Sequence, residues 1–252
     1  MDIRPALATS KKRLVMDDSL ADPLRPAAYF SPIRFRVTAF NVPTEPETMI
    51  DLYAAGTSNG MRARIGLEEC GLAYNLHPID LAKGEQKSPS FLAMNPNGQI
   101  PVIVDSDGPG GKPVTISQSV AVLMYCAEKS GKFLPKDPAA RPAFWQALAS
   151  AASDMSGMVS AIFTLSRAKD QHGPAIDTFK SMWKSYMKVW DDRLAKQRYC
   201  AGGEVTIADF ALYGVVARMK AAQPALLEGY TNVARWADAM AARPAVQRAM
   251  KF

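Results

Sequence analysis

Two short runs of residues have the types and spacing needed to bind a peptide. The first is Asn95-Pro96-Asn97-Gly98-Gln99-Ile100-Pro101-Val102, where turn residues lead to a proline directly before an apolar, strand-like segment. Proline removes a ladder hydrogen bond there, so we expect a functional reason for Pro101. If the Ile100–Pro101 bond is cis, the N–H and C=O of Ile100 turn outward and can pair with an extended peptide; the alternative is an ordinary trans proline.

The second run is Gln118-Ser119, which lies where a short strand, 113–116, gives way to a helical run, 120–129. We therefore expect Ser119 to cap the N-terminus of that helix. The first turn of a helix offers unpaired N–H groups and a positive dipole end, and both favour a carboxylate. The two runs together predict one site for a peptide that carries a carboxylate.

The elements that must position these runs alternate in type from residue 49 onward. Hydrophobic periodicity and turn residues predict four strands and three helices, in the order βαβ followed by ββα. The expected strands are 49–54, 74–79, 102–105 and 113–116, and the expected helices are 59–70, 88–93 and 118–130. This order predicts a small α/β domain over residues 49–132.

The rest of the chain has helical periods alone. A proline-bearing linker, 133–141, precedes residues 142–252, for which we predict an all-helical domain; in 174–199, for example, apolar residues recur every three or four positions. In Thr206-Ile207-Ala208-Asp209, the threonine can cap the third helical amide while the aspartate reaches back to the threonine N–H. This capping box predicts a firm helix start and serves folding rather than chemistry.

Composition limits the class of protein. The chain has 252 residues, 48% of them apolar and 21% charged, which is typical of a globular protein. It shows no apolar stretch approaching the ~18 residues of a membrane span and no apolar signal core, so we expect a cytoplasmic protein without a membrane partner. Residues 1–48 are rich in proline and charge and are expected to form an arm or to be partly disordered, unless Met49 is the true start.

Charge and metal-ligand types exclude further classes. The net charge is +6, but Lys and Arg are interleaved with Asp and Glu, which favours small anionic ligands over nucleic acid. The three cysteines show no C-x-x-C spacing and read as small buried hydrophobes. His77 and His172 lie far apart without ligand partners nearby, so we predict no metal.

Taken in this order and at these separations, the motifs resemble those of the cytosolic glutathione S-transferases over residues 49–252. They are the Asn-Pro-x-Gly-x-Ile-Pro loop, the Gln-Ser turn, the Thr-x-x-Asp box and the Arg243-Pro244-Ala245-Val246 ending. The resemblance implies the glutathione transferase fold, which is an α/β thioredoxin-like N-terminal domain followed by an all-α helical bundle domain. It also implies glutathione as co-substrate and a homodimer.

Within the family, two segments are similar to the bacterial Nu class, which is related to the yeast nitrogen-regulatory prion protein. These segments are Gly56-Thr57-Ser58-Asn59-Gly60 and Lys83-Gly84-Glu85-Gln86. Ser58 and Gln118 stand where that class commonly has Pro and Glu. Gln-Ser occurs in other transferase classes. This difference therefore weakens the Nu-class assignment more than it weakens the prediction of glutathione binding.

A cysteine-type thiol has a pKa near 8.5, so activation means stabilising its thiolate. Thr57 offers a hydroxyl donor and Asn59 an amide donor, both where the first strand leads into the first helix, whose N–H groups and dipole also favour an anion. We predict that these two residues are catalytic; the alternative is that they only cap the helix. Tyr53 is expected to pack and is the reserve donor.

The resemblance implies the remaining glutathione contacts. Gln86 would bind the glycine carboxylate, and Ile100, directly before Pro101, would pair through its backbone with the cysteinyl unit. Gln118 and Ser119 would bind the γ-glutamyl end. A second, apolar or disulfide substrate would lie between the domains, against five apolar residues: Met155, Met158, Val159, Ile162 and Phe163. Their helical spacing favours an ordinary core role for most of them.

Three functions remain open from the sequence. The first is a glutathione-dependent enzyme that reduces disulfides or hydroperoxides, or cleaves glutathione thioethers of the lignin aryl ether type. The second is conjugation of glutathione to an apolar electrophile. The third is a non-catalytic glutathione-binding regulator or ligand carrier, with residues 1–48 as its interaction arm.

Overall fold

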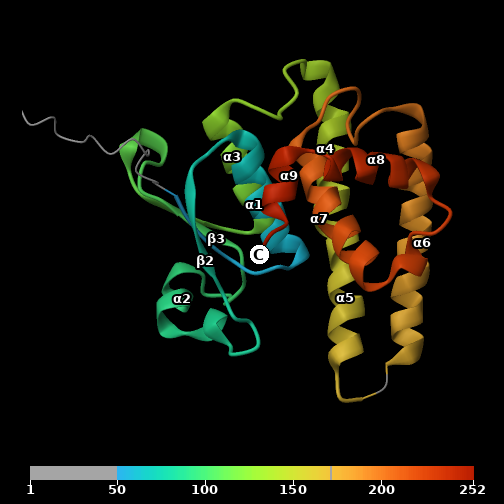
Figure 1. Ribbon diagram of the computed structural model, residues 1–252, viewed down its shortest axis with the longest axis horizontal. Coiled ribbons are helices and arrows are strands. Elements are labelled where there is room, and N and C mark those ends of the chain that lie inside the picture. Colours follow the sequence, from blue (N-terminus) through green and yellow to red (C-terminus); the bar gives the residue numbers. More distant parts are fainter. Residues whose placement is uncertain (1–49, 171) are drawn as a thin grey trace, which may run out of the picture. The chain divides into compact units, whose positions relative to one another are not determined.

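A four-stranded sheet occupies the first part of the chain (Figure 1). The computed structural model describes residues 50–170 and 172–252, so the expectations for residues 1–48 and for Met49 lie outside the described residues. The strands are β1 (Ile50–Ala54), β2 (Tyr74–Pro78), β3 (Val102–Asp105) and β4 (Val114–Ser117). Their order is β2-β1-β3-β4, with β1 parallel to β2 and β3 antiparallel to both of its neighbours. The predicted α/β fold is confirmed.

Helices α1 (Ser58–Cys70) and α3 (Ser119–Ser130) pack against each other and cover the sheet, with α2 (Pro89–Met94) between β2 and β3 in the chain. Two short 3₁₀ turns, η1 (Glu85–Lys87) and η2 (Pro109–Gly111), complete this part. Apolar side chains of the strands and of α1 and α3 bury one another in a small core: Ile50, Leu52, Ala54, Ala63, Leu67, Cys70, Ile103, Val122 and Cys126. This burial holds the end of β1 and the start of α1 in a defined place.

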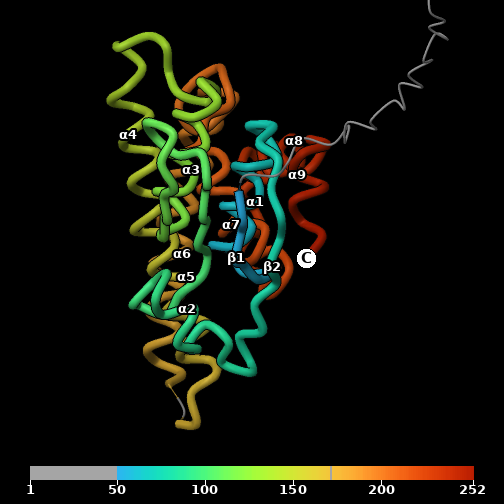
Figure 2. The backbone as a smooth tube through the Cα atoms, turned by 90° about the vertical axis from the view of Figure 1, so that its left-hand side faces the viewer, coloured from blue at the N-terminus to red at the C-terminus, as the bar shows by residue number. Residues whose placement is uncertain are grey.

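The remaining described residues are helical, as predicted. The helices are α4 (Arg141–Ala149), η4 (Ser150–Met155, a π-helical segment), α5 (Ser156–Arg167), α6 (Gly173–Lys196), α7 (Ile207–Ala222), α8 (Thr231–Ala241) and α9 (Pro244–Ala249), with 3₁₀ turns η3 (Pro138–Ala140) and η5 (Pro224–Leu226). Helices α5 and α6 lie side by side in both views (Figures 1 and 2). The domain boundaries at 132 and 142 stay predictions.

One helical stretch, Pro138–Arg167, is long and apolar enough by length and composition alone to cross a membrane, which the sequence did not anticipate. Its inward side chains, among them Phe144, Met155 and Ile162, belong to the larger of the two hydrophobic cores. That core also contains Trp183 and Trp236 from α6 and α8. Packing inside the helical part therefore accounts for the buried third of the apolar window in this stretch, 33% of which is buried.

Helix α7 is the most completely buried helix of the larger core, and its start confirms the capping box. Asp209 accepts hydrogen bonds from the N–H of Thr206 (2.9 Å), the hydroxyl of Thr206 (3.1 Å) and the N–H of Cys200 (2.8 Å). Trp236 Nε1 donates to the same carboxylate at 2.9 Å. These four donors share one buried acceptor, so the segment stabilises the fold.

Two further expectations can be compared with the structure. The cysteines Cys70, Cys126 and Cys200 are all buried, as predicted, and burial raises the pKa of each thiol. The prediction that Ser119 caps α3 is wrong. Gln118 occupies the N-cap position, with φ of 73°, and Ser119 is the first helical residue. Because the helix begins two residues after the end of β4, Gln118 takes the N-cap position, and the hydroxyl of Ser119 donates to Asn59 instead of capping α3.

Candidate functional site

The start of α1 is built on a threonine cap and a glycine. Thr57 is extended (φ −104°, ψ 166°), and its Oγ1 accepts a hydrogen bond from the N–H of Gly60 at 3.2 Å. A Cβ at residue 60 would lie 2.0 Å from the carbonyl oxygen of Ala55, so only glycine fits this turn. A hydroxyl that accepts one bond still has its proton to donate, and no described residue accepts it from Thr57. Thr57 can therefore cap the helix and donate to a ligand at the same time.

Asn59 is held by its side-chain oxygen. Oδ1 accepts from Nη1 of Arg62 at 3.1 Å and from the hydroxyl of Ser119 at 3.3 Å. Among the described residues, Nδ2 has no hydrogen-bond partner, so its two N–H groups are available to a ligand. The bond from Ser119 also joins the start of α3 to the start of α1, which brings one predicted glutathione contact next to one predicted catalytic residue.

The loop before β3 is shaped by its own polar side chain. Asn95 is buried, donates from Nδ2 to the carbonyl of Gln99 at 2.7 Å, and accepts from the N–H of Asn97 at 3.2 Å. Gly98 has φ of +58°, and a Cβ there would lie 2.6 Å from Nζ of Lys87, so glycine permits the close approach of this loop to η1. The Ile100–Pro101 bond is cis. Neither the N–H nor the C=O of Ile100 has a hydrogen-bond partner in the described part of the chain.

A hollow of about 520 Å³ lies against the start of α1. It is lined by Thr57, Ser58, Asn59, Leu81, Gln86, Lys87, Gly98, Gln99, Ile100, Val159, Ser160, Phe163, Thr164, Arg167 and Arg218. Four predicted site residues are thus together: Thr57, Asn59, Gln86 and Ile100. Pro101 is buried behind the lining, Ser119 reaches it through Asn59, and Gln118 is exposed beside Ser119. The roles of all seven stay predictions.

Gln86 provides a test of whether a peptide such as glutathione fits this hollow. Its Oε1 is buried and has no hydrogen-bond partner within the described structure. A buried amide oxygen without a donor costs about 1–3 kcal/mol, so the site is incomplete without a ligand that has polar groups. Rotating the amide by 180° exchanges Oε1 and Nε2, so Gln86 can meet either a peptide N–H or a carboxylate. The donor set fits glutathione, which has both.

The far wall of the hollow comes from α5 and α7. The guanidinium carbons of Arg167 and Arg218 lie 5.8 and 4.9 Å from the ring centre of Phe163, so two cations contact one aromatic ring. Neither arginine forms an ion pair with a described residue, and no acidic side chain lines the hollow. This wall therefore carries uncompensated positive charge that favours an anionic ligand.

Five apolar residues were predicted to contact the second substrate, and two of them line the hollow. Val159 and Phe163 do so, whereas Met155, Met158 and Ile162 are buried in the larger core, which is the alternative role that their helical spacing indicated for most of the five. Helical periodicity alone does not show which stripe of α5 faces a hollow. Arg167 could have been found from the sequence, since it follows Val159 and Phe163 at helical spacing; Arg218 could not, because only the fold brings α7 there.

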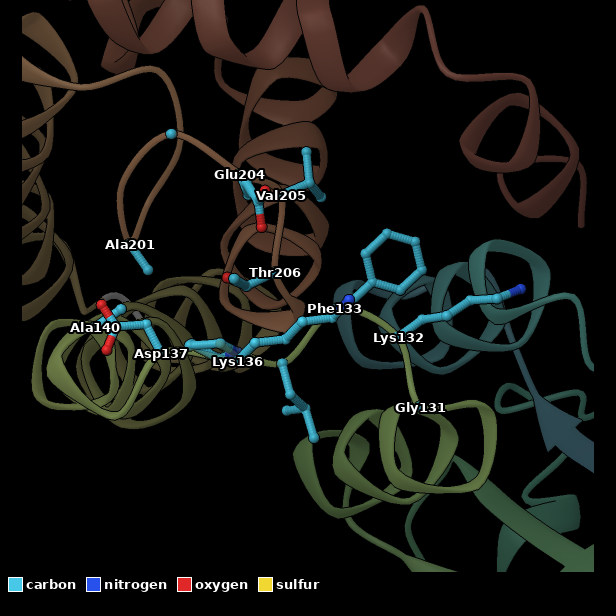
Figure 3. A pocket seen from close by; sticks show the side chains of 13 residues that line it. Gly131, Lys132, Phe133, Lys136, Asp137, Ala140, Ala201, Glu204, Val205 and Thr206 are labelled. Carbon is cyan, nitrogen blue, oxygen red and sulfur yellow. The ribbon is translucent and has the colours of Figure 1, made fainter.

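A second hollow, of about 690 Å³, lies between the linker and the loop before α7 (Figure 3). Phe133, Lys136, Glu204 and Thr206 are among its lining residues, and none of the seven predicted site residues is. The ring of Phe133 packs edge-on against Phe210, 4.9 Å between centres. This hollow thus borders core packing, and neither Thr57 nor Asn59 lines it.

Tyr53, the reserve donor, packs as predicted. Its ring stacks on His77 with centres 4.6 Å apart, and Phe91 meets it edge-on at 6.5 Å. Tyr53 does not line the hollow. In the described part of the chain, no group of three or more His, Cys, Asp or Glu residues is placed to hold a metal ion.

The arrangement described so far, with a thioredoxin-like sheet followed by a helical bundle and a peptide-sized hollow at the start of α1, defines a class of glutathione-binding proteins. Comparison with family models agrees: residues 58–129 match the glutathione S-transferase N-terminal domain, and residues 173–239 match the glutathione S-transferase C-terminal domain. The chain belongs to the glutathione S-transferase family, with a Nu-like character, and is a glutathione-dependent enzyme.

Individual relatives show how far the similarity extends. The disulfide-bond oxidoreductase YfcG of Escherichia coli (strain K12) is 35% identical over 204 residues, which cover 80% of this chain and 94% of YfcG. A glutathione transferase from Pseudomonas putida, solved with one glutathione disulfide bound per subunit, is 32% identical with a TM-score of 0.77, over 83% of this chain and 94% of that one. A family member from Pseudomonas fluorescens pf-5, solved with two glutathione bound, is 29% identical with a TM-score of 0.77, over 83% and 95%.

Proposed function

We propose that this chain uses glutathione to reduce disulfides whose substituents carry negative charge. The observation that carries the proposal is the pairing, across one hollow, of two thiol-directed donors at the start of α1 with the unpaired cations Arg167 and Arg218. Related proteins named as disulfide-bond oxidoreductases, and a related structure that holds glutathione disulfide, support the same reaction class.

The chemistry that glutathione supplies is thiol–disulfide exchange: two glutathione thiols are oxidised to one glutathione disulfide, the substrate S–S bond breaks, and the two protons pass to the released thiols. Thr57 and Asn59 donate hydrogen bonds to the sulfur and thereby favour the thiolate, which is the reactive form. A two-unit decrease in thiol pKa requires about 2.7 kcal/mol, which two directed hydrogen bonds and a helix N-terminus can provide.

The remaining lining residues hold the two reactants. Gln86 binds the glycine end of glutathione, and the backbone of Ile100 pairs with the cysteinyl unit. Gln118 and Ser119 bind the γ-glutamyl end. Arg167 and Arg218 meet the carboxylates of the disulfide on the opposite wall, with Phe163 keeping the two guanidinium groups in place. We place this activity in the cytoplasm, in a homodimer.

A second candidate is conjugation of glutathione to an apolar electrophile, which the apolar lining residues Leu81, Val159 and Phe163 of the same hollow favour. It needs the same thiolate but leaves a thioether instead of glutathione disulfide as product. Product analysis therefore separates the two candidates.

The test begins with the ultraviolet absorbance of glutathione thiolate as glutathione is titrated into the protein at neutral pH. We expect a thiolate signal that decreases at least tenfold in Thr57→Ala or Asn59→Ala, with glutathione binding retained. Binding without a thiolate signal in the unaltered protein would instead identify a carrier or regulator, and lack of binding would refute the assignment of the hollow.

The substrate half of the proposal is tested with two small disulfides of similar size, one with two carboxylates and one with two hydroxyls. We expect the dicarboxylate to be reduced with the higher kcat/KM, and Arg167→Met or Arg218→Met to remove that preference while the neutral disulfide is reduced as before. Equal rates for both disulfides in the unaltered protein would contradict the assigned role of the basic wall.

A further inference from the structure

Arg62 is a buried cation on α1 that the proposed chemistry has not yet used. Only 1% of its surface is exposed, and its guanidinium makes three hydrogen bonds to different elements. Nε donates to the carbonyl of Ala211 in α7 at 2.6 Å, and Nη2 donates to the carbonyl of Ala151 in η4 at 2.7 Å. Nη1 donates to Oδ1 of Asn59 at 3.1 Å. All three nitrogen atoms thus have partners, and one partner is a predicted catalytic side chain.

A glycine in α7 makes room for the side chain of Arg62. A Cβ on Gly214 would lie 2.8 Å from Cγ of Arg62 and 2.7 Å from the carbonyl oxygen of Ser58, so glycine lets α7 approach the first turn of α1. The carbonyl of Ala151 belongs to the π-helical segment η4 and also accepts from the hydroxyl of Ser156 at 3.1 Å. Arg62 therefore connects the helical part of the molecule to Asn59 in the candidate site by hydrogen bonds.

No described carboxylate compensates this charge. On the elements packed against Arg62, Asp209 of α7 accepts from Cys200, Thr206 and Trp236, and Asp154 of η4 accepts from Ser153. Burial lowers the pKa of the Arg62 guanidinium to about 10, so the group remains charged at neutral pH. An apolar side chain of similar length would avoid the cost of burying a charge, so stability alone gives no reason for arginine here.

The bond to Asn59 determines which way that amide faces. An amide has one acceptor and one donor end, and Arg62 can only donate. With Oδ1 bonded to Arg62 and to the hydroxyl of Ser119, the N–H groups of Nδ2 must face the other way, and Asn59 lines the hollow. A reversed amide would place Nδ2 against the guanidinium, donor against donor.

We propose that Arg62 is a positioning residue for the glutathione thiolate: it holds Asn59 by its oxygen so that the amide N–H groups point at the sulfur, and it places a buried positive charge behind that amide. This inference rests on the proposed function, because it assumes that the sulfur lies at Asn59. The other cations of the hollow, Lys87, Arg167 and Arg218, lie on its walls and are not bonded to either donor. Arg62, in contrast, is bonded both to Asn59 and to the helical bundle.

The experiment measures bound glutathione thiolate by its ultraviolet absorbance as a function of pH, in the full chain, with glutathione affinity measured separately by calorimetry. In Arg62→Met we expect the midpoint of thiolate formation to rise by about one pH unit, which is a tenfold smaller thiolate to thiol ratio near neutral pH. Glutathione affinity should change less than threefold. Arg62→Lys keeps the charge, but its single nitrogen atom cannot replace three nitrogen atoms that each contact a different acceptor, so its midpoint should lie between those of the unaltered protein and Arg62→Met.

Arg64→Met is the matched control, because Arg64 lies on the outer side of the same helix and bonds Tyr74, and its guanidinium stacks on Phe252. Its midpoint should equal that of the unaltered protein. In an Asn59→Ala background, Arg62→Lys should cause no further shift, since the amide to be positioned is absent. A full shift in that background, or an unchanged midpoint in Arg62→Lys itself, would overturn the positioning role.

Two other outcomes are decided by the same data. If Arg62→Met does not fold, Arg62→Lys measured alone and in the Asn59→Ala background still decides whether Arg62 positions the amide. If the unaltered protein binds glutathione without any thiolate signal, the proposed function fails and this inference fails with it; if only the variants lack the expected shifts, the proposed function stands without Arg62.

Discussion

Two helices of this molecule begin in similar ways and serve different purposes. Both α1 and α7 have threonine at the N-cap, Thr57 and Thr206. The residue three positions later is Asp209 in α7 and Gly60 in α1. In α7 the carboxylate takes up the donors at the helix start, including the threonine hydroxyl. In α1 the threonine oxygen accepts from Gly60, and the threonine proton and the amide N–H groups of Asn59 have no partner among the described residues.

The difference teaches that a cap becomes a binding site when the residue that would complete it is absent. A capping box satisfies the helix start within the chain, which stabilises the helix and leaves nothing to bind a ligand. A threonine followed by glycine satisfies one N–H group and leaves donors beside a positive dipole end. The predictions below separate these two roles, from the largest expected effect to the smallest.

Asp209→Ala should cause the largest loss of stability. The buried carboxylate accepts from the N–H of Cys200, both donors of Thr206 and the indole of Trp236, so its removal leaves several buried donors without an acceptor. We expect the free energy of unfolding, measured in urea, to fall by about 3–5 kcal/mol. The molecules that remain folded should bind glutathione and form thiolate as before; loss of thiolate from the folded fraction would mean that the two helix starts are coupled.

Gly60→Ala tests whether α1 tolerates a side chain at the position that Asp209 occupies in α7. Its Cβ would meet the backbone oxygen of Ala55 at 2.0 Å, so the turn between β1 and α1 has to move. We expect a loss of about 1–3 kcal/mol in unfolding free energy, the usual cost of overpacking, together with loss of thiolate because Thr57 and Asn59 move with the turn. Full thiolate formation by this variant would show that the geometry of the start of α1 does not matter for activation.

Thr206→Ala and Thr57→Ala form a matched pair. Each removes a threonine cap, which costs about 1 kcal/mol of unfolding free energy. Only Thr57→Ala should lower the bound thiolate, because only Thr57 lines the hollow. Urea unfolding and thiolate absorbance measured on both variants decide the comparison, and a similar loss of thiolate in Thr206→Ala would remove the distinction between the two helix starts.

Thr57→Ser should have the smallest effect. Serine keeps the oxygen that accepts from Gly60 and the proton that reaches the sulfur, so we expect a change of only a few tenths of a kcal/mol in stability. The midpoint of thiolate formation should stay within a few tenths of a pH unit. A large shift would show that the methyl group of Thr57, rather than its hydroxyl, is the important feature.

The sequence predicted the local elements well because their causes are local. The Thr206–Asp209 box and the glycines that end α1 and α3, Gly71 and Gly131, are short-range features with defined geometry. Ser119 shows the limit of this reasoning: the Gln-Ser turn was recognised, but the backbone of Gln118 takes a positive φ that moves the cap one residue earlier. Such a change depends on how β4 enters the turn and not on the residue types.

By itself, the sequence determined the order of strands and helices along residues 49–132 and the presence of a turn over residues 95–101, and it predicted Thr57 and Asn59 as donors, because each depends on neighbours a few residues away. Only the tertiary structure decided what surrounds those donors. Arg62 finds its acceptors 149 and 89 positions further along the chain, and Arg218 joins the wall opposite Thr57 and Asn59. Contacts at that separation follow from how the helical bundle packs against the sheet domain, and no local pattern encodes that packing.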